Sequence, residues 1–342
     1  MVTKVCGSRI VLAVAVFFFC LAGRAREANA LKINVPYVVN GKALTAMNGT
    51  AGSAVWFNNM FYFAYIAPDG NLGILADSNG GSNGQNVVSS YEIKILPRYV
   101  GGGGAAYGTA LVSYNGTLYV FYLNGFTDDG IPCNTLVMMT STDGVHWSQE
   151  YFVGFAGNGS SGFATPPTAV VWDGNILVYL NEETVDGDAF NGNLVQFNVV
   201  GTATSGPYRN YAGGATYSTS RRPSAAIWQG RLCLAFADAS NGNDIGMVTY
   251  TDATGWTAET LSGLYGIPSI FPLAAGALQL IYVPSNDHLY STFTSNGASF
   301  TTPQEDTAST SYHAAIPFSN WNLSSNWTFY VGENNELFTV LE

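Results

Sequence analysis

The chain has 342 residues and a formal net charge of −11 at pH 7, and charged residues make up only 10% of it. Nucleic acids and anionic membrane surfaces are bound by clustered Lys and Arg, so this composition argues against either as a partner. Aromatic residues are plentiful at 14%, which is typical of extracellular β-proteins and of proteins that bind carbohydrate.

Residues 1–30 are predicted to be a secretory signal peptide. Lys4 and Arg9 give a basic start, Ile10–Gly23 is an apolar run, and an A-x-A cleavage motif ends at Ala30. A membrane anchor is the alternative, but the run is shorter than the roughly 20 residues that cross a bilayer. We therefore expect a secreted or extracytoplasmic protein without membrane insertion, and one domain over residues 31–342.

After this segment, one pattern recurs six times: a small residue, then Ser, Thr or Ala, an apolar strand, a tight turn and a second apolar strand. The repeats begin at Gly52, Gly108, Pro167, Pro223, Pro268 and Ala314. Repeats of roughly 40 to 50 residues with several strands each indicate a β-propeller. We predict an all-β fold, a six-bladed β-propeller with four-stranded antiparallel blades. Seven blades is the alternative, if residues 199–217 hide a degenerate one.

The second repeat shows how a blade is built. Strands are predicted at 110–114 and 117–123, joined by Asn115-Gly116, the dipeptide that best suits a two-residue hairpin with positive φ. A third strand follows at 136–139 and a fourth at 150–153. Equivalent hairpin dipeptides stand in three other repeats: Asn58-Asn59, Asp173-Gly174 and Gln229-Gly230.

The two ends of the chain are predicted to close the ring. The third strand of the last repeat, 337–341, has no fourth strand behind it, while the strand at 33–39 belongs to no repeat. If the N-terminal strand forms the outer edge of the last blade, it joins the ends of the ring and covers an open edge.

The segment Ser141–Trp147 resembles the Asp box, the S/T-x-D-G-x-x-W/F turn of sialidases and related propellers, with degenerate copies at 251–256 and 294–300. The resemblance implies that Asp143 caps the turn through backbone N–H groups and that the aromatic residue plugs the blade edge. It also implies that these turns lie opposite the ligand face. Asp143, His146 and Trp147 are therefore interpreted as structural.

The resemblance does not extend to sialidase chemistry. Sialidases hold the substrate carboxylate with three arginines, and no such triad is evident here, so the prediction leans against an enzyme. The hairpin pattern resembles the propeller lectins of bacteria and fungi, several of which recognise fucose or other neutral sugars. This implies a secreted, non-catalytic, carbohydrate-binding protein that needs no cofactor and has glycans or glycoconjugates as partners. The alternatives are a glycoside hydrolase or polysaccharide lyase that uses two carboxylates of the ligand face, and a protein-binding propeller.

Candidate binding residues follow from propeller geometry. The starts of the first strands ring the mouth of the central channel, and the loops from second to third strands lie on the same face. Aromatic, cationic and acidic side chains that meet there could stack on a sugar and bind its hydroxyls. The candidates are Tyr107, Arg221, Arg222, Tyr265, Tyr312, His313, Asp129 and Asp188. The loop acids also suit Ca²⁺ as ligands. In the alternative interpretation the acids are only solvated, and Arg221 and Arg222 form salt bridges with them.

Trp172 and Trp228 each precede a hairpin turn, and this recurrence has two interpretations. The rings either pack the blades together or form a repeated sugar platform between blades, which would make the protein multivalent.

Overall fold

The computed structural model describes residues of the unit Leu31–Glu342. The described residues are 33–39, 42–46, 52–78, 87–93, 108–128, 131–158, 165–182, 192–208, 211, 215–217, 219, 221–273, 276–286, 288–310, 316–320, 325–331 and 336–341. Within these ranges, no helix is long and apolar enough to cross a membrane.

The described strands form six four-stranded antiparallel sheets, here called blades 1 to 6. Blade 1 holds β4 (Ser53–Phe57), β5 (Met60–Ile66), β6 (Leu72–Asp77) and β7 (Val87–Ile93); blade 2 holds β8 (Thr109–Tyr114), β9 (Thr117–Asp128), β10 (Ile131–Ser141) and β11 (Tyr151–Asn158). Blade 3 holds β12 (Thr168–Trp172), β13 (Asn175–Glu182), β14 (Asn193–Val200) and β15 (Ala203–Tyr208).

The second half of the chain repeats this order. Blade 4 holds β16 (Ser224–Trp228), β17 (Arg231–Asp238), β18 (Asp244–Thr251) and β19 (Gly255–Tyr265), with a short 3₁₀ helix, η2 (Ala239–Asn241), between β17 and β18. Blade 5 holds β20 (Ile267–Pro272), β21 (Leu278–Val283), β22 (His288–Thr294) and β23 (Gln304–Thr310). Blade 6 holds β24 (Ile316–Asn320), β25 (Ser325–Val331), β26 (Leu337–Leu341) and β1 (Ile33–Pro36), and β2 (Val38–Val39) pairs with β3 (Lys42–Ala43) outside the blades.

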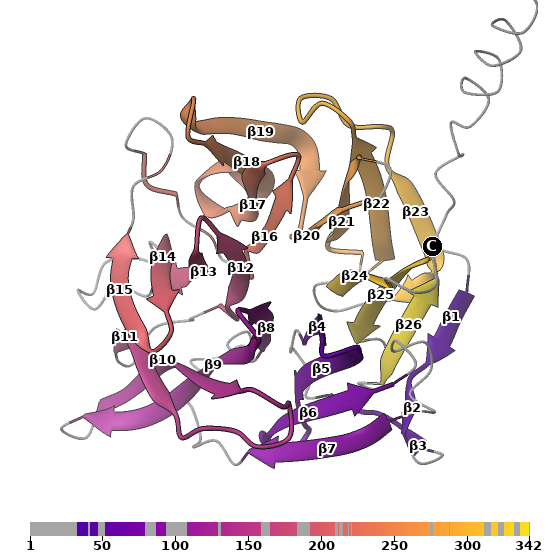
Figure 1. The fold of residues 1–342 in the computed structure, drawn as a ribbon. Coiled ribbons are helices and arrows are strands. Elements are labelled where there is room, and N and C mark those ends of the chain that lie inside the picture. Colours follow the sequence, from indigo (N-terminus) through magenta and orange to yellow (C-terminus); the bar gives the residue numbers. More distant parts are fainter. Residues whose placement is uncertain are drawn as a thin grey trace, which may run out of the picture. The chain divides into compact units, whose positions relative to one another are not determined.

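The blades surround a common centre. Each first strand contacts the first strand of the next blade, from β4 to β8, β12, β16, β20 and β24, and β24 contacts β4 again (Figure 1). This arrangement confirms the predicted all-β propeller of four-stranded antiparallel blades. The first ten residues of the segment 199–217, which could have hidden a further blade, complete β14 and form β15 of blade 3.

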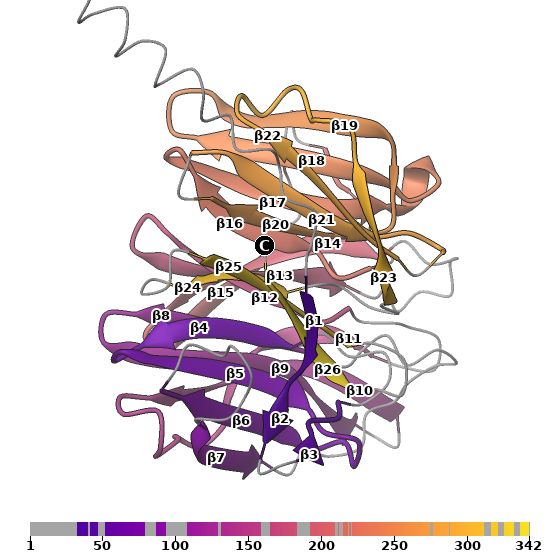
Figure 2. The ribbon, with the colours of Figure 1, turned by 90° about the vertical axis from the view of Figure 1, so that its right-hand side faces the viewer.

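The N-terminal strand closes the ring as predicted. β1 runs antiparallel to β26, with Ile33 opposite Leu341, and the two strands lie side by side in both views (Figures 1 and 2). Directly after β1, the Tyr37 hydroxyl donates a hydrogen bond to Asp77 Oδ2 at 3.0 Å. Both side chains are buried, and burial, with the Asp77 charge second, raises the pKa of Tyr37. This contact ties the closing segment to blade 1.

The predicted hairpins adopt the expected backbone. Asn115 and Gly116 have φ of 49° and 70°, the left-handed pair of values that a type I′ turn needs and that lets two strands continue with their natural twist. Asn58-Asn59, Asp173-Gly174 and Gln229-Gly230 also have positive φ at both residues.

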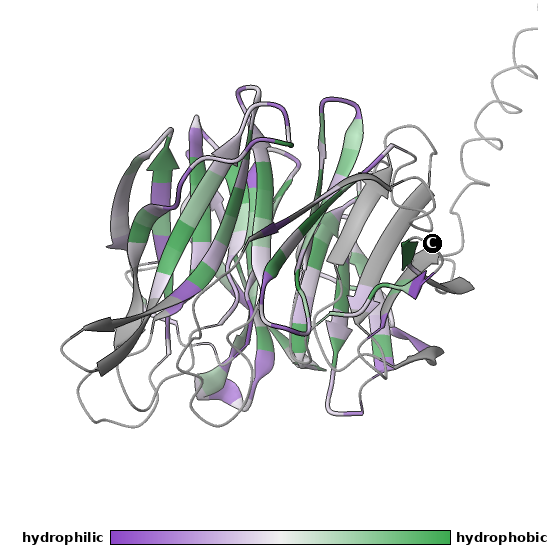
Figure 3. Cartoon of the chain, turned by 90° about the horizontal axis from the view of Figure 1, so that it is seen from below, coloured by the Kyte–Doolittle hydropathy of each residue, from purple (hydrophilic) through white to green (hydrophobic). Residues whose placement is uncertain are grey.

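Most of the core lies between neighbouring blades. One buried cluster joins Phe121 and Leu136 of blade 2 to Val178 and Phe197 of blade 3, and similar clusters join blades 1 and 2, 3 and 4, and 4 and 5. Figure 3 shows the apolar residues along the strands and the hydrophilic ones at many of the strand ends. Burying each large apolar side chain contributes about 1.5–3 kcal/mol, so stability is spread around the ring.

One predicted loop is wrong. The strands predicted at 117–123 and 136–139 leave the segment between them as a loop, and its Gly, Pro and paired Asp residues favour turns. In the structure β9 continues to Asp128 and β10 begins at Ile131, and these two residues pair. The hydrogen-bonded ladder of a long hairpin overrides the local preference of the sequence for a turn.

Candidate functional site

The two ends of each blade carry different chain connections. The turns between first and second strands and between third and fourth strands share one end, here called the hairpin face. There, Asn58 Nδ2 donates to Thr142 O at 3.5 Å and the Tyr114 hydroxyl donates to Gly174 O at 3.0 Å, in each case from one blade to the next. The opposite end, called the open face, carries the starts of the first strands and the connections from second to third strands.

On the hairpin face, the turn Ser141–Trp147 is held by its own polar side chains. Asp143 Oδ1 accepts hydrogen bonds from the backbone N–H groups of Val145 and His146, both at 2.8 Å. Asp143 Oδ2 lies 2.6 Å from His146 Nδ1. The hydrogen bond with the His146 side chain is the largest cause that lowers the pKa of Asp143. The half-buried Trp147 packs against the cluster between blades 1 and 2.

A second turn, Thr294–Phe300, repeats this pattern without a carboxylate. Asn296 Oδ1 accepts from the N–H groups of Ala298 and Ser299 at 2.9 and 3.0 Å, and Thr294 Oγ1 accepts from Gly297 at 2.9 Å. The turn therefore needs a side-chain oxygen rather than a negative charge.

The two tryptophans weighed as a sugar platform lie in packing contacts near the hairpin face. Trp228 is 2% exposed, and its indole N–H donates to Gly276 O at 2.9 Å. The Arg231 guanidinium carbon lies 5.9 Å from the Trp228 ring centre. Trp172 is half-buried and meets the Tyr250 ring edge-on at 6.3 Å. With their rings engaged in this way, we leave both residues out of the site proposed below.

Toward the open face, a different aromatic position recurs on the second strand of three blades. Tyr65 of blade 1 lies opposite Gly73, and Phe236 of blade 4 lies opposite Gly246. A Cβ at Gly73 would lie 2.5 Å from Tyr65 Cζ, and one at Gly246 would lie 2.8 Å from the Phe236 ring. Each ring therefore lies flat across bare backbone of the third strand.

Blade 5 has the same position filled by two tyrosines. Tyr282 lies opposite Tyr290, and their rings stack with centres 5.4 Å apart and planes at 22°. Tyr282 packs with residues of blade 4, as Phe236 packs with residues of blade 3. Tyr65 lies on the corresponding side of blade 1, since its neighbour Ala64 belongs to the cluster shared with blade 2. The three aromatic positions thus face the preceding blade.

In blade 1, polar groups gather around the aromatic ring. Glu92 lies opposite Gly73 on the fourth strand. Asn71 Nδ2 donates to Asp69 Oδ2 at 2.8 Å and to Glu92 Oε1 at 2.6 Å. Burial first, and then the charges of Glu92 and Asp69, raise the pKa of Tyr65. An aromatic ring, an amide and two exposed carboxylates therefore form one group, here called the Tyr65 cluster.

Blade 5 has a matching group, the Tyr265 cluster. Tyr265, at the end of β19, is 48% exposed. Burial, followed by Tyr290 and Tyr265, raises the pKa of Tyr282 to about 12. Asn286 Nδ2 donates to the Tyr290 hydroxyl at 3.0 Å. Glu305 lies opposite Tyr290 on the fourth strand, the register position that Glu92 has in blade 1.

In blade 4 a pocket of about 120 Å³ opens beside Phe236, lined by Tyr217, Asp238 and residues of β18 and β19. The Tyr217 and Phe236 rings are 5.0 Å apart and inclined at 49°. Asp238 Oδ1 accepts from the N–H and the hydroxyl of Ser240. Burial, with Asp238 second, raises the pKa of Tyr217. Gly246 leaves the space for this pocket, because a larger residue there would meet Phe236.

Three of the predicted binding residues lie in the described ranges. Tyr265 is part of the cluster above. Arg221 is exposed, and its backbone N–H and O bond to the Thr219 hydroxyl. Arg222 lies at the central channel. The other predicted residues, Tyr107, Asp129, Asp188, Tyr312 and His313, lie outside the described residues.

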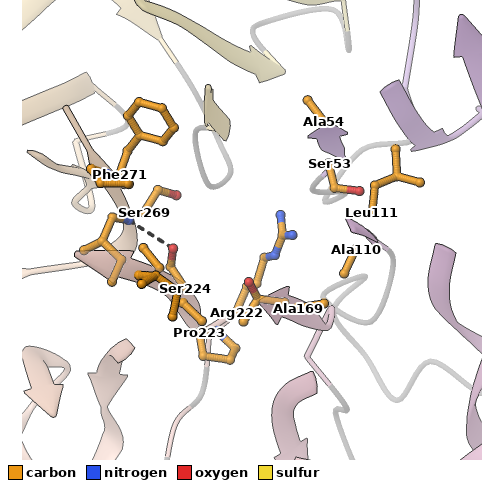
Figure 4. Close-up of a pocket in the computed structure, with 16 residues that line it drawn as sticks. Ser53, Ala54, Ala110, Leu111, Ala169, Arg222, Pro223, Ser224, Ser269 and Phe271 are labelled. Carbon is orange, nitrogen blue, oxygen red and sulfur yellow. Dashed lines mark hydrogen bonds between the residues drawn. The ribbon is translucent and has the colours of Figure 1, made fainter. Parts of the chain in front are cut away.

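Arg222 joins four blades at the centre of the ring. Its Nη1, Nη2 and Nε donate to the backbone oxygens of Gly52, Thr109 and Pro167 at 2.8, 3.0 and 3.2 Å. These oxygens lie at the starts of β4, β8 and β12. Figure 4 shows the guanidinium pointing into the space between the first strands. Burial lowers the pKa of Arg222 to about 10, so the side chain stays cationic at neutral pH.

Sequence reasoning missed Tyr65, Tyr217 and Tyr282, because it searched the loops for ligand groups. For Tyr65 and Phe236, the signal was an aromatic residue near the end of a second strand with a glycine eight or ten residues later, but only the strand register shows that the two face each other. Among the described residues, no group of three or more His, Cys, Asp or Glu side chains is placed to hold a metal ion.

The comparisons with known proteins concern the fold. No family model matches the sequence, and no curated protein matches it. Among solved structures, the chain is similar to AofleA of Arthrobotrys oligospora, with 12% identity, a TM-score of 0.57 and coverage of 93% of this chain and 88% of that one. It is also similar to the Aleuria aurantia lectin, described as a six-bladed β-propeller with a novel mode of fucose recognition, with 16% identity, a TM-score of 0.54 and coverage of 85% and 90%.

A third similar structure is a neuraminidase-like protein from a little yellow-shouldered bat isolate, with 10% identity, a TM-score of 0.55 and coverage of 91% and 98%. Chains this different in sequence can share a fold while their sites differ. The chain is therefore a β-propeller structurally similar to fungal fucose lectins and to neuraminidase-like propellers.

Proposed function

We propose that this protein is a secreted, non-catalytic, carbohydrate-binding propeller with six blades, and that it binds sugars between neighbouring blades near the open face. The observation that carries the proposal is the repeated aromatic position of blades 1, 4 and 5, which has acidic side chains beside it in each case. A repeated site is what a protein needs to hold several sugars of one glycan or one surface at once.

The chemistry of these sites suits a sugar. A pyranose ring has an apolar face of C–H groups that packs on an aromatic ring, and hydroxyl groups that donate to carboxylates and accept from amides. The Tyr65 cluster offers both kinds of contact, since Asp69 and Glu92 are exposed and Asn71 joins them. The Tyr265 cluster combines an exposed ring with Asn286 and Glu305.

Fucose is the first sugar to test, because one of the similar folds is described by its recognition of fucose. A neutral sugar also suits the charge of these sites, because an anionic sugar would be repelled by the carboxylates. The low affinity of each single site would be raised by multivalent attachment.

The test is binding of the purified protein to an array of neutral and acidic glycans, followed by titration of the best ligand. Tyr65→Ala and Tyr265→Ala should each reduce binding to a multivalent surface by at least about tenfold, because each loses one aromatic contact and the avidity that it supports. Phe152→Ala is the matched control: Phe152 is 53% exposed, against 48% for Tyr265, but lies on the outer strand of blade 2.

Two results would overturn the proposal. One is an absence of binding to any glycan on the array. The other is glycan binding that both tyrosine variants leave at the wild-type level. Turnover of a polysaccharide by the wild-type protein would instead favour the hydrolase or lyase alternative.

A further inference from the structure

The centre of the ring contains a cavity of about 370 Å³. The first strands of blades 1 to 5 line it with hydroxyl groups and small or apolar side chains, among them Thr168. Figure 4 shows five others: Ser53, Leu111, Ser224, Ser269 and Phe271. Its volume falls in the range of roughly 300–1,000 Å³ that pockets for small ligands occupy. It is distinct from the sites between blades described above.

Among the described residues that line this cavity, Arg222 is the only charged one. Its three hydrogen bonds to Gly52, Thr109 and Pro167 fix the guanidinium in place. A guanidinium has five N–H donors, so two remain after these bonds. An anchored cation with spare donors is already organised for a planar anion, and binding would cost little side-chain entropy.

Among the described residues, no carboxylate forms an ion pair with Arg222. Within the described part of the chain, the ion pairs join His146 to Asp143 and His288 to Glu305, and neither includes Arg222. The three carbonyl oxygens solvate the guanidinium, but they carry no net charge. A cation that is withdrawn from water without a counter-charge is unfavourable, and an anion in the cavity would relieve this cost.

Among the hydroxyl groups on the wall, those of Ser224 and Thr168 can donate to a ligand, and that of Ser53 cannot. Ser53 Oγ lies 2.9 Å from Thr109 Oγ1, and because Thr109 donates to Ala64 O, Ser53 must donate to Thr109. Ser224 Oγ accepts from the Ile270 N–H at 3.0 Å and keeps its proton for a ligand. Thr168 adds a second hydroxyl from the neighbouring first strand.

We propose that the central cavity binds a small hydroxylated monocarboxylate, whose carboxylate pairs with Arg222 and whose hydroxyl groups meet Ser224 and Thr168. Because Arg222 is the one cation among the described lining residues, it favours a ligand with a charge of −1. The hydroxyl groups and the volume of the cavity favour a polar organic body over a bare inorganic anion.

The test is calorimetric titration of the full chain in chloride-free buffer with sodium D-glucuronate, and with D-glucuronamide, which has the same body without the charge. Glucuronate should bind the wild-type protein at least about tenfold more tightly than glucuronamide, because only the carboxylate makes charge-assisted hydrogen bonds. Arg222→Gln should remove this preference, and Arg222→Lys should keep part of it, since lysine retains the charge without the planar fork.

Because Arg222 joins several blades, ligand binding by its variants is compared only if thermal unfolding shows that they fold. Ala169→Met keeps Arg222 and fills the cavity from the wall, and it should weaken glucuronate binding at least about tenfold by the volume it takes. His146→Ala, on the exposed turn of the hairpin face, should bind glucuronate as the wild type does. Equal binding of glucuronate and glucuronamide, or unchanged glucuronate binding by Ala169→Met, would overturn the proposal.

Discussion

Aromatic and acidic residues stand on both faces of the propeller, but they contact different partners on each face. On the hairpin face, Trp228 is buried and its N–H is bonded to the next blade, and Asp143 is bonded to backbone N–H groups of its own turn. On the open face, Tyr265 is exposed, and Asp69 and Glu92 share an amide at the surface. An aromatic or acidic residue in a repeat is therefore informative about binding only when its partners are known. Each of the following substitutions tests whether a residue stabilises the fold or binds a glycan.

The largest effect is expected for Trp228→Ala. It removes a buried indole together with its hydrogen bond to the Gly276 carbonyl, so the free energy of unfolding should fall by about 3–5 kcal/mol. Glycan binding by the folded fraction should be unchanged. Chemical denaturation measures the first and titration below the unfolding transition measures the second. Trp172→Ala, at a half-buried ring, should cost less; an equal loss would contradict the packing contrast.

A smaller loss is expected for Gly73→Ala. The new methyl group would meet the Tyr65 ring, and overpacking of this kind costs about 1–3 kcal/mol. Binding at the Tyr65 cluster should weaken, because the ring has to leave its place. A double-mutant cycle checks the cause: in a Tyr65→Ala background, Gly73→Ala should cost almost nothing. The same cost in both backgrounds would show that the ring is not responsible.

Tyr265→Ala should show the opposite balance to Trp228→Ala. The ring is half-exposed, and surface substitutions change the free energy of unfolding by less than about 0.5 kcal/mol. Glycan binding should fall all the same. Tyr265→Phe keeps the stacking surface and should retain most of the affinity, which distinguishes ring packing from hydroxyl contacts. Loss of stability without loss of glycan binding would show that Tyr265 stabilises the fold and does not bind the glycan.

The smallest effect is expected for Asp143→Asn, because Asn296 holds the equivalent turn with an amide oxygen. The difference should lie in the pH dependence. The pKa of Asp143 is lowered by its hydrogen bonds, so its contribution is complete above the unfolded pKa of about 3.9 and is lost as the pH falls through the folded value. Melting temperatures should therefore separate above pH 4 and converge in stronger acid. A constant difference at every pH would contradict this assignment.

Much of the scaffold could be predicted because its determinants are local. Asn115-Gly116 specifies its own turn through backbone preference, and the repeated starts mark the first strands without any knowledge of their partners. Closure by β1 was predictable from one unpaired strand at each end. The loop after Asn124 was predicted wrongly because cross-strand pairing, which has no local signature, decided it.

The candidate sites depend on contacts between distant parts of the chain. Tyr65 and Gly73 meet through strand register, and Tyr217 reaches Phe236 from a connecting segment. Arg222 was selected from its position before a first strand, but its partners begin three other strands, Gly52 among them, 170 residues away. Side-chain partners at such separations follow from the assembled ring and cannot be read from spacing.

The pairing of β1 with β26 also sets the order in which the molecule can be completed. Ile33 leaves the ribosome long before its partner, Leu341. Until β26 is made, β1 lacks its partner strand, whereas Tyr37, directly after β1, can already donate its hydrogen bond to Asp77 of blade 1. The ring can therefore close only after residues 337–341 have been made, and an unfinished ring exposes a strand edge to association with other chains.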